Sequence, residues 1–165
     1  MGGAIRILHV GHGCRPWRPG GLVTYAEELM EAQTKAGCEV AYFFSGRHYP
    51  VASKPRLRRW DRGGVSMYEL LNSRVVFGED AGTRTPVREL DEPFAERYLR
   101  QAIAEFQPDV ISFLDLAGLP FSLIDIAREG RHPVLMTAHD YLPLCPTVKL
   151  YDADGRNCVR DRVGE

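Results

Sequence analysis

The chain has 165 residues, 44% of them hydrophobic, which is enough for one domain with a sizeable core. Lysine and arginine total 21 against 22 aspartate and glutamate residues, a balance that argues against a general nucleic-acid-binding protein. The first apolar run, residues 5–10, is too short for a signal peptide or a membrane span, so we expect a cytoplasmic location.

The first 44 residues predict a strand, a loop, a helix and a second strand. The strands cover 5–10 and 39–44, and the loop 11–21 between the first strand and the helix contains four glycines and two prolines. A helix that packs on a sheet is indicated by apolar residues at helical spacing, and Gly37 is a typical stop signal. The apolar positions are Leu22, Tyr25, Ala26, Leu29 and Met30.

Residues 45–64 show no clear periodicity and predict a long surface insertion. Within it the segment 47–62 is basic and also contains Tyr49 and Trp60. Such a segment suits contact with anionic lipid headgroups at a membrane surface, but an ordinary solvated loop has the same composition. Its basic residues are Arg47, His48, Lys54, Arg56, Arg58, Arg59 and Arg62.

The rest of the chain alternates strand and helix patterns. The expected strands are 65–71, a weaker one at 74–77, a buried one at 109–114, and 134–138; the expected helices are 93–106 and 120–129. Alternating strands and helices predict βαβ units. We therefore expect an α/β fold with a Rossmann-like, doubly wound parallel sheet and helices on both faces.

The C-terminal residues differ from this pattern. Residues 148–151 and 157–159 flank Asp154-Gly155, which predicts a β-hairpin. No closing helix or strand follows the hairpin, so we expect residues 1–165 to be one domain cut from a longer protein.

In such a sheet, ligands bind where parallel strands end at their carboxyl edge. This rule selects three places: the loop 11–21, the turn after Asp115, and the residues from His139 onward. Gly20-Gly21 stands directly before a helix, where backbone N–H groups can approach an anion. A flexible turn would explain the two glycines equally well.

His139 and Asp140 follow a predicted strand, and Asp115 ends a neighbouring one, which favours a functional site. A core histidine satisfied by a backbone carbonyl is the alternative for His139. A zinc site that adds Cys145 and Cys158 is not expected, because these residues lack the short paired spacing of structural zinc ligands.

A dinucleotide site is also not expected at the first loop. The fingerprint requires a third glycine where this chain has Pro16, and the second strand ends without the acidic residue that binds a ribose.

Taken together, three stretches resemble the N-terminal domain of family 4 retaining glycosyltransferases. They are 5–10 continuing through Pro16 and Pro19 to Gly20-Gly21, then 106–111, and 137–146. The resemblance implies one half of a GT-B architecture, the acceptor-side domain, without the C-terminal domain that holds most of the donor. This polypeptide alone is then expected to be inactive.

The resemblance further implies transfer of a sugar from a nucleotide sugar to a carbohydrate or lipid-linked acceptor, with no metal or other cofactor. Gly20 and Gly21 match the glycines that approach the donor diphosphate, and His139 matches a histidine that contacts the transferred sugar. We assign Asp115 and Asp140 to the acceptor. The alternative function is a non-catalytic Rossmann-like module that binds a sugar or a phosphorylated metabolite.

Overall fold

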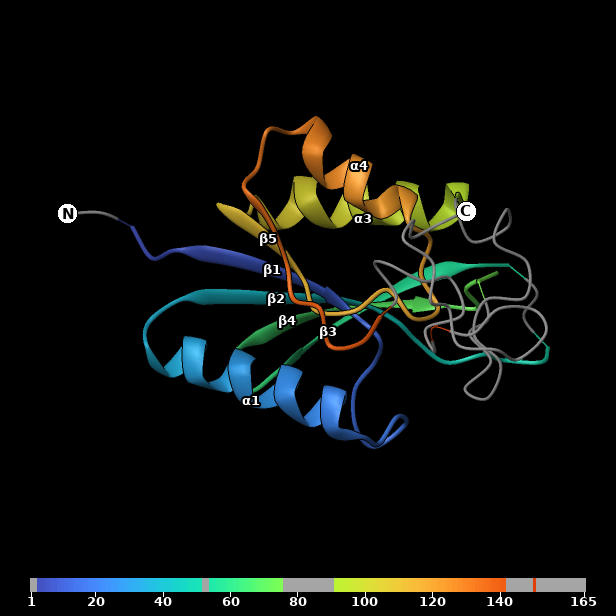
Figure 1. Cartoon of the computed structure of the whole chain (residues 1–165), viewed down its shortest axis with the longest axis horizontal. Coiled ribbons are helices and arrows are strands. Elements are labelled where there is room, and N and C mark those ends of the chain that lie inside the picture. Colours follow the sequence, from blue (N-terminus) through green and yellow to red (C-terminus); the bar gives the residue numbers. More distant parts are fainter. Residues whose placement is uncertain (1–2, 52–53, 76–90, 142–149, 151–165) are drawn as a thin grey trace.

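A computed structural model describes residues 3–51, 54–75, 91–141 and 150. Its centre is a six-stranded sheet with α1 on one face and α3 and α4 on the other (Figure 1). The helices are α1 (Gly21–Lys35), α3 (Pro93–Phe106) and α4 (Ser122–Glu129). The strands are β1 (Arg6–Gly11), β2 (Glu39–Ser45), β3 (Arg56–Arg62), β4 (Val65–Leu71), β5 (Val110–Phe113) and β6 (Val134–Met136).

The strand order is β3-β4-β2-β1-β5-β6, and every neighbouring pair is parallel except β3 and β4. This topology confirms the predicted α/β, Rossmann-like sheet with helices on both faces. Because β4, β2, β1, β5 and β6 run in the same direction, their carboxyl ends lie along one edge of the sheet.

The segment 45–64 is not the irregular insertion that we expected, because it contains the antiparallel edge strand β3. Gly63 and Gly64, with φ of 62° and 83°, form the two-residue turn into β4. Positive φ at both central positions is the requirement of a type I′ hairpin turn, and glycine meets it without steric cost. The Gly-Gly pair was therefore a sequence signal for this hairpin.

Two apolar clusters cover the two faces of the sheet. On one face, α1 buries Val23, Ala26 and Met30, whereas Tyr25, which is predicted to be on the buried stripe, is 40% exposed. On the other face, α3 and α4 pack against buried residues of the central strands such as Phe43. These helices bury Ala95, Leu99, Ala102, Phe106, Leu123, Ile126 and Ala127.

The predicted helix at 93–106 is confirmed as α3, and its ends show why it forms there. Glu92 caps the first turn by accepting a hydrogen bond from Ala95 N at 2.7 Å, and Pro93 occupies the first helical turn. Gln107 then adopts a left-handed conformation before Pro108, which ends the helix.

The strand expected at 134–138 is shorter and less buried than predicted. It ends at Met136, and Leu135 and Met136 are 58% and 41% exposed, because β6 pairs only with β5 among the described strands. Arg74 and Val75 lie in no strand. Several predictions fall outside the described residues. They concern the remainder of the weak strand, the hairpin at 148–159 apart from Leu150, and the cysteines Cys145 and Cys158.

The described helices include none that is long and apolar enough to cross a membrane.

Acidification from pH 7 is expected to destabilise the fold through His9 in β1. Its ring is 1% exposed, Nε2 lies 2.7 Å from Gln33 Oε1, and burial lowers its pKa below 6.5. Between the lowered pKa and about pH 6.5, the unfolded chain binds more protons at His9 than the folded chain does. The free energy of unfolding therefore decreases as the pH is lowered through that window. The melting temperature should drop between pH 7.5 and 5, and His9→Gln should reduce this drop.

Asp115 changes the stability with pH in the opposite direction to His9. The contribution of His9 is therefore measured as the difference between the parent chain and His9→Gln, which both contain Asp115. Burial raises the pKa of Asp115, so its contribution to stability falls as the pH rises. Equal losses of melting temperature in His9→Gln and the parent chain would contradict the role of His9.

Candidate functional site

The turn after β5 is organised by Asp115. Its Oδ1 accepts hydrogen bonds from the backbone N–H groups of Leu116 and Ala117 at 2.7 and 3.1 Å, and its Oδ2 lies 3.9 Å from His12 Nδ1. Burial raises the pKa of this carboxyl group, while the Ala117 hydrogen bond and His12 act in the opposite direction. Asp115 therefore shapes the turn, and only Oδ2 remains outside the two backbone hydrogen bonds.

His12 joins the loop after β1 to the turn after β5. Nδ1 is 3.1 Å from the carbonyl oxygen of Ala117, and Nε2 is 2.9 Å from Nη1 of Arg18. Both contacts are satisfied by a neutral ring that donates from Nδ1 and accepts at Nε2. No pattern in the sequence singles out His12 or Arg18, because their contact depends on the geometry of the loop.

Gly20 and Gly21 form an open start of α1 at the carboxyl edge. Gly20 is the N-cap with φ 135°, a conformation that favours glycine, and a Cβ at either glycine would meet no atom within 4 Å. The helix has no side-chain cap and no acidic residue in its first turn. The first N–H groups and the positive end of the helix dipole are thus open to an anion.

His139 lies beside the same helix, three residues beyond the end of β6. Its exposed ring contacts Tyr25 edge to face, with ring centroids 4.7 Å apart. Tyr25 follows Gly21 by four residues, so it stands one turn further along the same helix face. The structure therefore brings His139 close to the start of α1, and its exposure does not fit a core histidine.

Asp115, His139 and Asp140 line a small space between the ends of β5 and β6. Its volume is about 10 Å³, room for no more than about one water molecule. Both carboxylates line this space, and the charge of Asp140 contributes to the raised pKa of Asp115. A sugar that contacts His139 would lie against the exposed side of the ring rather than inside this space.

A larger and basic cavity of about 320 Å³ opens at the ends of β1, β2 and β4. Trp17 and Arg18 from the first loop line it, together with Arg47 and His48 after β2 and Glu69 of β4. Trp17 and Glu69 are not among the site residues predicted from the sequence. A charged residue in the apolar run 65–71 was the available signal for Glu69.

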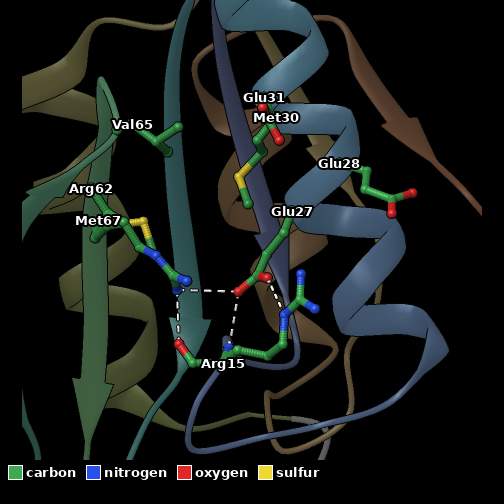
Figure 2. Close-up of a pocket in the computed structure, with 9 residues that line it drawn as sticks. Arg15, Glu27, Glu28, Met30, Glu31, Arg62, Val65 and Met67 are labelled. Atoms are coloured by element: carbon green, nitrogen blue, oxygen red, sulfur yellow. Dashed lines mark hydrogen bonds and ion pairs between the residues drawn. The ribbon is translucent and has the colours of Figure 1, made fainter.

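Glu27 of α1 fixes the first loop, as Figure 2 shows. It accepts hydrogen bonds from Arg15 N at 3.0 Å and from Arg62 Nη1 at 3.1 Å, and Arg62 also donates to the carbonyl oxygen of Arg15 at 2.7 Å. Met30 and Met67 lie in the same pocket, between α1 and β4. These contacts attach the loop that leads to Gly20 to both α1 and β3.

Within the described part of the chain, no three His, Cys, Asp or Glu side chains are grouped to hold a metal ion.

The family model of Glycosyltransferase Family 4 matches residues 19–161, which is most of the chain. No curated protein matches the sequence significantly. The match includes Gly20, Gly21, Asp115, His139 and Asp140, and the parallel sheet with helices on both faces agrees with a Rossmann-like half of a GT-B enzyme. The chain therefore belongs to glycosyltransferase family 4 and is an N-terminal domain of that family.

Proposed function

We propose that the chain is the acceptor-side domain of a retaining enzyme that transfers a sugar from a nucleotide sugar to a carbohydrate or lipid-linked acceptor. The observation that supports this most is the approach of His139 to the open start of α1 through Tyr25. An anion at Gly20-Gly21 and a sugar at His139 would be neighbours, as the diphosphate and the sugar are in a nucleotide-sugar donor.

The proposed roles follow from this arrangement. The N–H groups at Gly20 and Gly21 stabilise the negative charge that develops on the departing diphosphate, and this requires no metal ion or other cofactor. His139 orients the transferred sugar. Asp115 and Asp140 lie on the adjacent loops and contact hydroxyl groups of the acceptor, whose attacking proton passes to a donor phosphate oxygen in a retaining reaction of this kind.

A cytoplasmic location and a membrane contact through residues 47–62 remain proposals. Much of the charge in that segment is already paired, because Arg58, Arg59 and Arg62 form ion pairs with carboxylates of the fold. Their partners are Glu69, Glu105 and Glu27. Only weak, salt-sensitive binding to acidic vesicles is therefore expected.

The proposed transfer is tested with the complete enzyme and a panel of UDP- and GDP-sugars. Release of nucleotide in the presence of acceptors, with the anomeric configuration kept and with activity preserved in a metal chelator, is the expected result. The isolated chain should bind the same donors weakly or undetectably in calorimetry. Binding at low micromolar or better would place the main donor site in this domain, and inertness toward every donor would contradict transfer.

A further inference from the structure

We infer that the cavity lined by Trp17, Arg18, Arg47 and His48 binds a phosphate or carboxylate group of the acceptor. This inference rests on the proposed transfer reaction and adds the chemical class of the acceptor to it. We call this cavity the anion cavity.

The charges around the anion cavity leave a positive surplus. Its one acidic lining residue, Glu69, is fully buried, and both of its oxygens bind the guanidinium of Arg47, at 2.9 and 3.1 Å. Arg58 lies 3.8 Å from the same carboxylate. The negative charge of Glu69 is therefore already compensated by Arg47 and Arg58. The positive charge of Arg18 on the cavity wall has no other acidic counterpart among the lining residues.

Both arginines of the anion cavity are held in place before any ligand binds. Arg47 is fixed by Glu69 and lies over the ring of Trp17, 4.1 Å from its centroid. Arg18 is fixed through Nη1 by His12, while its Nε and Nη2 make no hydrogen bond to any described residue. Arg47 already uses its Nε and Nη2 on Glu69, so the open Nε and Nη2 of Arg18 are the pair that suits the two-oxygen geometry of phosphate and carboxylate. A fixed guanidinium plane loses little entropy when it binds such a group.

Two glycines allow this arrangement. A Cβ at position 13 would come within 2.6 Å of Arg18 Cδ, and a Cβ at position 46 would collide with the Glu69 side chain. Gly13 and Gly46 thus let the side chains that line the cavity pack directly against the backbone of the two loops.

The position of the anion cavity separates it from the proposed donor site. The cavity lies toward β2 and β4, whereas His139 follows β6, on the other side of β1 in the sheet. The loop after β1 contributes to both places, since it carries Arg18 and ends at Gly20. An acceptor anchored in the cavity by its anionic group can therefore extend along this loop toward the donor.

The first test is an NMR titration of the isotope-labelled chain with glucose 6-phosphate, glucuronate, inorganic phosphate and glucose. The three anions should shift the amide signals of Gly13, Arg18 and residues 46–48, with millimolar affinity that weakens as salt rises, and glucose should not. Arg18→Gln should weaken anion binding about tenfold. The matched control Arg100→Gln removes a surface arginine of α3 and should change nothing.

The anions also distinguish the chemistry of the group. Stronger binding of glucose 6-phosphate than of glucuronate assigns the cavity to a phosphorylated acceptor, and the reverse order assigns it to a uronic acid. Shifts absent at these amides, or unchanged affinity in Arg18→Gln, would overturn the inference.

The second test uses the complete enzyme with matched anionic and neutral acceptors. Arg18→Gln should raise the KM for the anionic acceptor about tenfold, and Arg100→Gln should not. Both variants should use the neutral acceptor as the parent enzyme does. An unchanged KM for the anionic acceptor in Arg18→Gln would overturn the inference while leaving the transfer reaction intact. The opposite outcome, anion binding in the NMR titration without transfer from any nucleotide sugar, would contradict the proposed function alone.

Discussion

His139→Ala in the complete enzyme is expected to lower kcat on the order of a hundredfold, with the donor Kd nearly unchanged. A positioned hydrogen bond that strengthens in the transition state contributes mainly to kcat, and loss of one such donor costs rates of this size. The melting temperature should change little, because the His139 ring is exposed and packs on the surface of α1 against Tyr25.

Single-turnover kinetics with saturating donor measure the chemical step, and thermal unfolding measures the fold. His132→Ala is the matched control, since His132 precedes β6 at the opposite end of the same strand. A large loss of melting temperature in His139→Ala, with normal turnover by the protein that remains folded, would show that His139 has a structural role.

The order of the central elements could be predicted because each leaves a local pattern in the sequence. The strands β1, β2, β4 and β5 are apolar and buried, and α3 combines a regular apolar stripe with Glu92-Pro93 at its start. In contrast, four of the seven residues of β3 are arginines, and only Leu57 and Trp60 are partly buried. An edge strand of this kind buries too little apolar surface to produce a strand pattern.

The candidate site could be predicted only where it depends on the ends of strands and helices. Gly20, Asp115 and His139 were selected because they follow a strand or precede a helix. The contact between His139 and Tyr25 joins residues 114 positions apart and required the fold. The same is true of the anion cavity, whose walls come from the loops after β1 and β2 and from residues of β2 and β4.

The Tyr25 position shows the limit of periodicity most directly. Its helical spacing predicted a core residue, yet the buried side chains of α1 are Val23, Ala26 and Met30. The buried stripe is therefore centred about one position away from the predicted one, and Tyr25 lies at the surface, where it contacts His139.

Arg47→Met is expected to lower the free energy of unfolding by about 3 kcal/mol. It removes the two side-chain donors to Glu69, whose side chain is fully buried, and an uncompensated buried carboxylate typically costs about 3–5 kcal/mol. We expect the lower end of that range, since Arg58 and the backbone N–H of Arg47 still face the carboxylate. Urea unfolding measures the change.

The double variant Arg47→Met, Glu69→Leu separates the cost of the unpaired charge from the cost of lost packing. Removing both partners of a buried ion pair is often close to neutral, so the double variant should recover most of the stability lost in Arg47→Met. Arg100→Met breaks an exposed pair with Glu129 and should cost no more than about 1 kcal/mol. A similar loss of unfolding free energy in Arg47→Met and Arg100→Met would mean that Arg58 alone compensates the charge of Glu69. The pair with Glu69 would then not hold Arg47 in place.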